Sequence, residues 1–147
     1  METYMTTKML AKWSLTALLT LNPAFAQPIA KATIPFDFSV GGTKMTAGAY
    51  TVRSVVPGTV QLSRDDSKSS AIVITFGVQA QKPPQGASLV FNRYGNAYFL
   101  SQVWGAGNSL GKQLQQSKPE RESASAASSG RLASAPAQVN VTLTSSR

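Results

Sequence analysis

The side chains that most often perform catalysis are scarce in this sequence. Its 147 residues include no histidine, no cysteine and only six carboxylates. This composition excludes Ser-His-Asp and Cys-His nucleophile systems, histidine zinc sites and thiol redox chemistry. Asp65 and Asp66 are adjacent, so on an extended segment they would point in opposite directions and could not act as an acid–base pair. The sequence therefore favours a protein that is not an enzyme and that uses no cofactor or metal ion.

Two segments resemble catalytic motifs only superficially. Ser67 and Lys68 are neighbours in a polar loop and carry no mechanism, although a serine–lysine dyad assembled from distant residues stays open. The segment 105–111, GAGNSLG, resembles a phosphate loop but lacks the GKS or GKT of a P-loop. Neither segment changes the expectation of a non-catalytic protein.

One cluster of polar and aromatic residues is a candidate ligand site. It consists of Asn92, Arg93, Tyr94, Tyr98 and Trp104. Aromatic rings stack on sugars or apolar molecules, and asparagine and arginine anchor polar groups, so this cluster could bind a polysaccharide or a small apolar ligand. The alternative, which we favour, is that the rings belong to a small β core and that Arg93 stacks across the strand on Tyr98.

These residues lie in Ser88–Trp104, which predicts a central β-hairpin. Its two apolar strands flank Gly95-Asn96, and glycine in the first position is typical of a type II′ turn. The expected pairs are Arg93–Tyr98, Phe91–Leu100 and Leu89–Gln102 on one face, and Tyr94–Ala97, Asn92–Phe99, Val90–Ser101 and Ser88–Val103 on the other. Both faces carry large apolar groups, so the hairpin should be covered on two sides.

Four further segments alternate between apolar and polar residues, as half-buried strands do. Their apolar faces are Ile34, Phe36, Phe38 and Val40 in 32–40; Tyr50, Val52 and Val56 in 49–56; Val60 and Leu62 in 59–64; and Ile72, Ile74, Phe76, Val78 and Ala80 in 71–80. Gly41-Gly42 and Pro57-Gly58 supply turns between them. These faces are expected to pack on the hairpin. About six strands result, which predicts an all-β fold, a small antiparallel sandwich or barrel.

The sequence beyond Trp104 changes in character. Leu110 and Leu114 are spaced as on a helix, so a short helical turn is expected over 110–116. The β-rich domain would then cover 27–116, followed by a low-complexity tail over 117–147. Serine and alanine dominate Ser117–Ala137, which is predicted to be disordered or linker-like. Val139, Val141 and Leu143 alternate and could add an edge strand, but a frayed tail is favoured.

The first 26 residues have the pattern of an export signal. Lys8 precedes a mostly apolar run over 9–21, and Ala24-Phe25-Ala26 is an A-x-A cleavage pattern. Cleavage after Ala26 and a periplasmic or extracellular location are predicted. The apolar run is well short of the ~20 residues that span a bilayer, which disfavours an uncleaved anchor, and no later segment is apolar and long enough to cross as a helix. About six strands are also too few for an outer-membrane barrel, which usually has at least about eight.

The formal net charge of +8 raises the question of a polyanionic partner. Basic residues are scattered along the chain without a run or a basic helix. We therefore expect solubility and weak attraction to acidic envelope polymers or a glycan, rather than a nucleic-acid site.

Three stretches resemble a group of small, signal-peptide-bearing, β-rich exported bacterial proteins without an assigned function. They are Ile34–Val52, Leu89–Trp104 and the GKQLQQSKPERE segment at 111–122. The resemblance implies an exported β-rich domain and carries over no catalytic residue. The expected role is that of a structural or interaction module of the cell envelope or extracellular space, with ligand binding as the alternative.

Overall fold

The computed structural model describes residues 28–131 and 135–144. The predicted signal segment and its cleavage site at Ala26 lie outside these residues. The strands are β1 (Pro28–Ile34), β2 (Phe38–Val40), β3 (Thr43–Met45), β4 (Gly48–Arg53), β5 (Thr59–Arg64), β6 (Ser70–Gln79), β7 (Ser88–Tyr94), β8 (Ala97–Trp104), β9 (Leu110–Leu114) and β10 (Ala137–Thr142), with helix α1 (Lys118–Ser128) between the last two. The predicted all-β class is confirmed, although the described residues form ten strands rather than about six.

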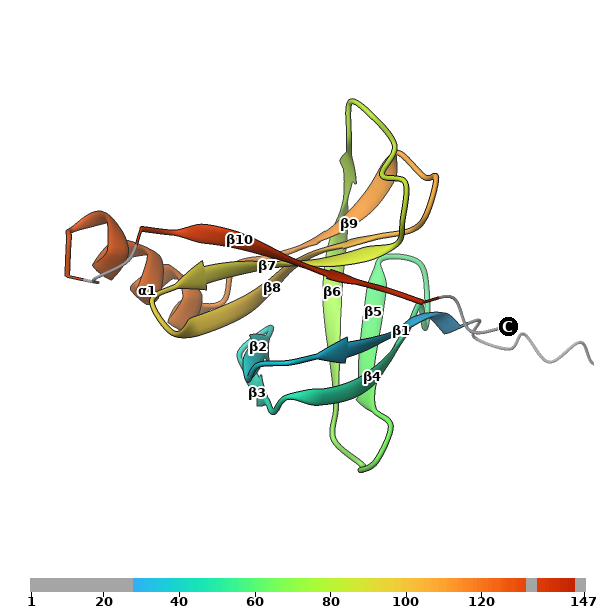
Figure 1. Ribbon diagram of the computed structural model, residues 1–147, viewed down its shortest axis with the longest axis horizontal. Helices are drawn as coiled ribbons and strands as arrows, with labels where there is room; N and C mark the ends of the chain where they lie inside the picture. Colours follow the sequence, from blue (N-terminus) through green and yellow to red (C-terminus); the bar gives the residue numbers. More distant parts are fainter. Residues whose placement is uncertain (1–27, 132–134, 145–147) are drawn as a thin grey trace, which may run out of the picture.

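The strands form one curved mixed sheet. Its order is β1-β4-β5-β6-β9-β8, after which β8 pairs with β7 and β7 pairs with β10. Strand β6 joins two groups of strands, because residues 70–74 pair with β5 and residues 75–79 pair with β9 (Figure 1). The two ends of this order meet at one bridge, where Lys31 and Thr144 exchange two backbone hydrogen bonds of 2.8 Å. The β2–β3 hairpin attaches to β8 through a parallel bridge between Ser39 and Phe99.

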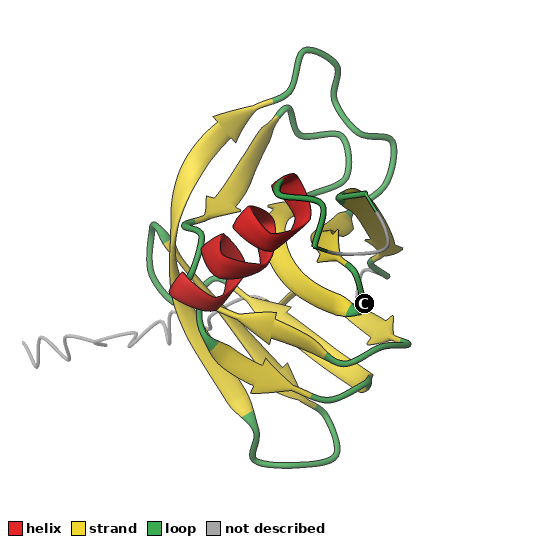
Figure 2. Cartoon of the chain, turned by 90° about the vertical axis from the view of Figure 1, so that its left-hand side faces the viewer, coloured by secondary structure: helices red, strands yellow, loops and turns green. Residues whose placement is uncertain are grey.

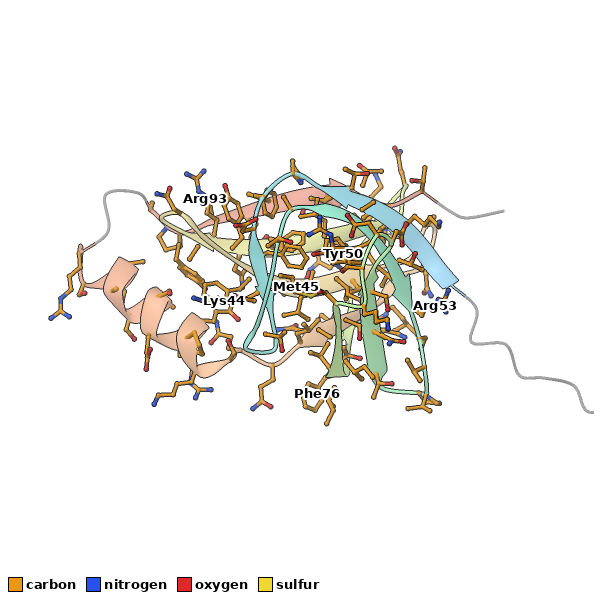
Figure 3. All side chains as sticks on the ribbon, turned by 90° about the horizontal axis from the view of Figure 1, so that it is seen from below. Lys44, Met45, Tyr50, Arg53, Phe76 and Arg93 are labelled. Carbon is orange, nitrogen blue, oxygen red and sulfur yellow. The ribbon has the colours of Figure 1, made fainter. Side chains whose placement is uncertain are left out.

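The hydrophobic core lies inside the curve of the sheet. Its largest fully buried side chains are those of Tyr50, Phe91, Ile34, Leu62, Leu89, Val40, Val52 and Val60. The Phe38 ring meets Tyr50 and Phe91 edge to face, with centroids 5.2 and 5.4 Å apart, the arrangement that aromatic quadrupoles favour. Figure 3 shows Tyr50 between the strands, where its hydroxyl donates to the Thr46 carbonyl at 2.5 Å. The core therefore connects the strands on the β5 side of β6 with those on the β9 side.

Several sequence predictions are confirmed. β5 has the predicted bounds, and Val60 and Leu62 are both buried. Gly58 has φ +79° and the Thr59 N–H donates to the Val56 carbonyl at 3.0 Å, as expected for a turn containing Pro57-Gly58. The predicted strand over 32–40 is divided into β1 and β2 around Pro35, which lacks the N–H that a continuous ladder needs.

The orientation predicted for 71–80 is wrong. The strand exists as β6, but Ala71 and Thr75 point inward and the large apolar side chains point outward. Alternation places Ile72, Ile74 and Phe76 on one face without saying whether that face is the buried one. Val56, expected to share a buried face with Tyr50 and Val52, is also exposed, because β4 ends at Arg53.

The central hairpin has the predicted turn and a different register in its outer half. Gly95 has φ +62°, as the first position of a type II′ turn requires. The pairs nearest the turn are as expected, but a bulge between Val90 and Phe91 shifts the rest, so that Leu89 opposes Val103 instead of Gln102. The shift turns both Leu89 and Val103 into the core.

Three predictions for the C-terminal region are wrong. Residues 110–114 form strand β9, which pairs with β6 and β8, instead of a helical turn. The segment predicted as a disordered linker contains α1, which lies across the outside of the strands (Figure 2). The region predicted as a frayed tail contains β10, which pairs with β7 along six residues. Its ladder and the buried Leu143 stabilise it where local sequence could not indicate a partner.

Candidate functional site

The predicted ligand residues Arg93 and Tyr98 lie together on the inner face of the hairpin. Phe36 stacks on the Tyr98 ring with centroids 4.0 Å apart and an interplanar angle of 15°. The Arg93 guanidinium lies over the same ring, 5.7 Å from its centroid, while its Nε donates to the Gly95 carbonyl at 2.8 Å. A phenylalanine and a guanidinium both pack on the Tyr98 ring, which is partly buried against the core.

The other three predicted ligand residues lie on the outer face. Tyr94 and Trp104 are buried without belonging to the main core, and Asn92 donates through Nδ2 to Glu120 Oε1 of α1 at 2.9 Å. Trp104 packs against Gly111 so closely that a Cβ on this glycine would come within 2.6 Å of the indole. The five residues therefore form no common surface.

A groove of about 390 Å³ borders Tyr98 at the end of the β2–β3 hairpin. Asp37, Lys44 and Asn96 line it together with Phe38 and Met45, which belong to the core. Asp37 already accepts a hydrogen bond from the Ala47 N–H at 2.9 Å. The groove therefore combines polar edges with the partly buried ring of Tyr98.

Ser54 and Lys112, distant in sequence, meet in the structure. Lys112 Nζ donates to Ser54 Oγ at 2.7 Å, and burial lowers the pKa of Lys112. Lys112 also follows Ser109 with S-x-x-K spacing, yet its ammonium contacts Ser54. Among the described residues, neither Ser54 nor Lys112 lines the groove beside Tyr98 or the hollows along β6. Catalysis by such a pair would also need hydrogen-bond donors for an oxyanion beside the serine. We interpret the contact as a structural hydrogen bond, in which the Ser54 hydroxyl accepts from the half-buried ammonium of Lys112.

The carboxylates of the described region are engaged in local structure. Asp65 accepts from Thr51 Oγ1 at 2.6 Å and lies 3.6 Å from Lys31, while Asp66 pairs with Arg64. Glu122 pairs with Lys118 within α1. Among the described residues, no group of three or more acidic side chains is placed to hold a metal ion.

The outward face of β6 exposes three large apolar side chains to solvent. Ile72, Ile74 and Phe76 are 61%, 70% and 57% exposed, respectively. They occupy alternate positions of one strand, so they form a continuous apolar stripe. Figure 3 shows Phe76 projecting away from the ribbon. We call this set of three side chains the β6 stripe.

Two adjoining hollows, of about 460 and 510 Å³, run along the β6 stripe. Both are lined by Leu114 at the end of β9, by Gln115 and Gln116 after it, and by Arg121 of α1. Ile72 and Ile74 line the first hollow and Phe76 lines the second. We call the two hollows together the β6 furrow. Arg121 is the one charged residue among the described residues that line it.

Helix α1 borders the furrow through Arg121. A capping pattern in the sequence, absent from the predictions above, marks where this helix starts. Ser117 accepts a hydrogen bond from the Glu120 N–H at 3.4 Å, and Pro119 stands in the first turn. Ser-x-x-Glu is the capping-box pattern, and proline is well tolerated in a first helical turn. The low hydrophobicity of residues 117–137 instead favoured the prediction of a disordered segment.

Glu120 fixes α1 to the hairpin at an electrostatic cost. Its side chain is only 3% exposed and contacts Asn92. Burial raises the pKa of Glu120, partly offset by the hydrogen bonds from Asn92 and Ser117. Burial, and then the charge of Glu120, raise the pKa of Tyr94.

Glu120→Gln should remove a pH-dependent cost of folding. Because the folded-state pKa of Glu120 is raised, protonation of its carboxyl favours the folded state. This contribution to the unfolding free energy is complete below the unfolded pKa of about 4.3 and is lost as pH rises through the folded pKa. Wild type and Glu120→Gln should therefore have similar unfolding free energies in acid, and the variant should be the more stable at neutral pH. Urea unfolding at both pH values measures this. Glu122→Gln, which keeps the buried carboxylate, should follow wild type, whereas a less stable Glu120→Gln at neutral pH would contradict the prediction.

Comparison of the chain with protein-family models, with curated proteins and with solved structures gives no match. Within the described residues, no helix has the length and apolar character required to cross a bilayer.

Proposed function

We propose that this protein is an exported, non-catalytic β domain that acts as a structural or interaction module of the cell envelope or extracellular space, and that it contacts its partner through the β6 stripe. The single observation that carries the proposal is the outward orientation of Ile72, Ile74 and Phe76. In a strand with one face in solvent, the residues on that face are normally polar. Contiguous exposed apolar side chains beside polar ones are typical of an interaction surface.

The packing of β6 indicates that the stripe is held at the surface by the fold and is not a set of core residues left unpacked. The inward positions of β6 next to it, Ala71 and Thr75, are buried. A register slip of one residue would bury the isoleucines and expose these smaller groups. Pairing with β5 and β9 on opposite edges holds β6 in its observed register, which keeps the stripe at the surface.

Binding of a polysaccharide or small apolar ligand is less well supported. The five residues expected to form such a site lie on two faces of the hairpin, and the ring of Tyr98 already packs against Phe36 and Arg93. Of the five, Tyr98 alone lines the groove described above, so the groove does not bring the predicted ligand residues together.

The test replaces the stripe by threonine, which keeps strand propensity. The variant Ile72→Thr/Ile74→Thr/Phe76→Thr, called the β6-Thr variant, should stay folded, because exposed substitutions each change stability by only about 0.5 kcal/mol. In size-exclusion chromatography of envelope extracts, wild type should elute in a larger complex and the β6-Thr variant as a monomer.

The matched control is Val55→Thr/Val56→Thr, which alters exposed apolar residues outside β6. It should elute like wild type. Equal complex formation by wild type and the β6-Thr variant would refute the role of the stripe. Recovery of the protein only from the cytoplasm with Met1 intact would refute export.

A further inference from the structure

We infer that the partner is an extended polypeptide segment, rich in alternating apolar and acidic residues, that adds as a strand to the open edge of β6 inside the β6 furrow. This inference rests on the proposed function and specifies the chemistry of its partner. Three observations carry it: an unpaired strand edge, apolar side chains beside that edge, and the charge of the furrow.

The first half of β6 has one edge without a strand partner among the described residues. The Thr75 N–H donates to the Gly58 carbonyl on the β5 side at 2.8 Å. Since backbone groups alternate in direction along a strand, Ile72 and Ile74 direct their N–H and C=O groups to the opposite side. On that side β9 pairs with residues 75–79 and ends at Leu114. Because the Thr75 N–H points to β5, the Thr75–Leu114 pair is held by the bonds of its neighbours, which engage the Ile74 C=O. The N–H and C=O of Ile72 and the N–H of Ile74 remain directed to the furrow.

The furrow lies along this edge. Its first hollow is lined by Ile72, Val73 and Ile74 on one side and by residues 114–117 on the other. A strand that enters it would bond to the N–H and C=O of Ile72 and to the N–H of Ile74, and would place alternate side chains next to theirs. Strand addition of this kind takes its affinity from main-chain bonds and its specificity from alternate side chains. The exposed isoleucines favour apolar residues at those positions.

The charge of the furrow selects the remaining side chains. Arg121 is exposed at its border, and its Nη1 donates to the Gln116 carbonyl at 3.0 Å, which leaves other guanidinium donors for a ligand. No carboxylate occurs among the described residues that line the furrow. A partner with carboxylates is therefore complementary to it.

A second copy of the chain fits this surface less well. Each copy has a formal net charge of +8, and a two-fold contact at the furrow would bring two Arg121 side chains to one interface. Like charges placed together across an interface disfavour association.

The test uses a fluorescein-labelled peptide of alternating valine and glutamate, about eight residues long, the length of an ordinary strand. Fluorescence anisotropy should show saturable binding to the wild-type protein that weakens with added salt. The β6-Thr variant should lose at least about tenfold in affinity, because two flanking isoleucines and a phenylalanine are removed. Arg121→Gln should lose roughly two- to fivefold, as expected for an exposed ion pair.

Two control peptides separate strand addition from general stickiness. N-methylation of the residues that bond to β6 should abolish binding, whereas N-methylation of the alternate residues should not. A valine–lysine peptide should bind more weakly than the valine–glutamate peptide.

Equal binding of both N-methylated peptides would overturn strand addition, and equal binding of the lysine peptide would overturn the preference for acid. Concentration-dependent dimers of the purified protein that disappear in the β6-Thr variant would assign the furrow to a second copy. If envelope complexes depend on the stripe but no peptide binds, the inference fails while the proposed function stands. If no complex depends on the stripe, the proposed function itself fails.

Discussion

Replacing Phe91 by alanine is expected to lower the free energy of unfolding by about 3–5 kcal/mol. Phe91 is fully buried in β7 and lies edge-on to Phe36 and Phe38, with ring centroids 5.1 and 5.4 Å apart. Its removal leaves a cavity between the hairpin and the β2–β3 side of the molecule. Urea unfolding followed by far-ultraviolet circular dichroism measures the loss.

Ile74→Ala is the control for this prediction. Ile74 is 70% exposed, so its truncation should change the unfolding free energy by only about 0.5 kcal/mol. The sequence pattern alone, which placed Ile74 in the core, would give a loss of about 2–5 kcal/mol instead. A larger loss for Ile74→Ala than for Phe91→Ala would mean that β6 faces the opposite way.

The second large effect is expected at Leu143. Its side chain is buried in the core and its N–H donates to the Ala87 carbonyl at 2.8 Å, directly after strand β10. Leu143→Ala should therefore lower the unfolding free energy by about 2–5 kcal/mol.

Gln138→Ala, on the exposed part of β10, should change the unfolding free energy by only about 0.5 kcal/mol. A frayed tail would leave stability unchanged in both variants. Equal thermal midpoints for wild type, Leu143→Ala and Gln138→Ala would therefore show that the β10 ladder does not contribute to the fold.

Local patterns in the sequence predicted the turns and the existence of most strands. Gly95 and Gly58 adopt the positive φ that their turns require, and the Val60–Leu62 alternation identified β5 correctly. These features depend on residues close together in the chain, so a short window contains the information needed.

Features that depend on distant partners were not predictable in the same way. The alternation of Ile72, Ile74 and Phe76 defines a face, but only the packing of both sheet groups decides which face is buried. Val139 and Val141 became a strand because β7 offered an edge far away in sequence. The start of α1 was a different case, since its Ser117–Glu120 capping box was visible in the sequence and was outweighed by composition.

The candidate site was predicted less well than the fold. By residue type, Tyr94, Tyr98 and Trp104 are candidates for a ligand site, and the favoured alternative is that their rings pack in the fold. In the structure these rings are packed, and Arg93 lies over Tyr98 as that alternative expects. The sequence predicts that the β6 stripe belongs to the core, because isoleucine and phenylalanine are usually buried. An exposed apolar surface and a core strand have the same composition, and only the three-dimensional neighbours distinguish them.

The bridge between Lys31 and Thr144 has a consequence for the order of folding. These two residues are 113 positions apart, yet their hydrogen bonds join the ends of the strand order. During synthesis, β1 can pair with β4 early, but the bridge on its other edge forms only after the ribosome has delivered residue 144. Topologies dominated by such non-local contacts fold slowly, in about milliseconds to seconds. In that interval the open edges of β1 and β6 are both available to other chains, so a chaperone that binds extended segments would protect the nascent protein when it is most prone to aggregate.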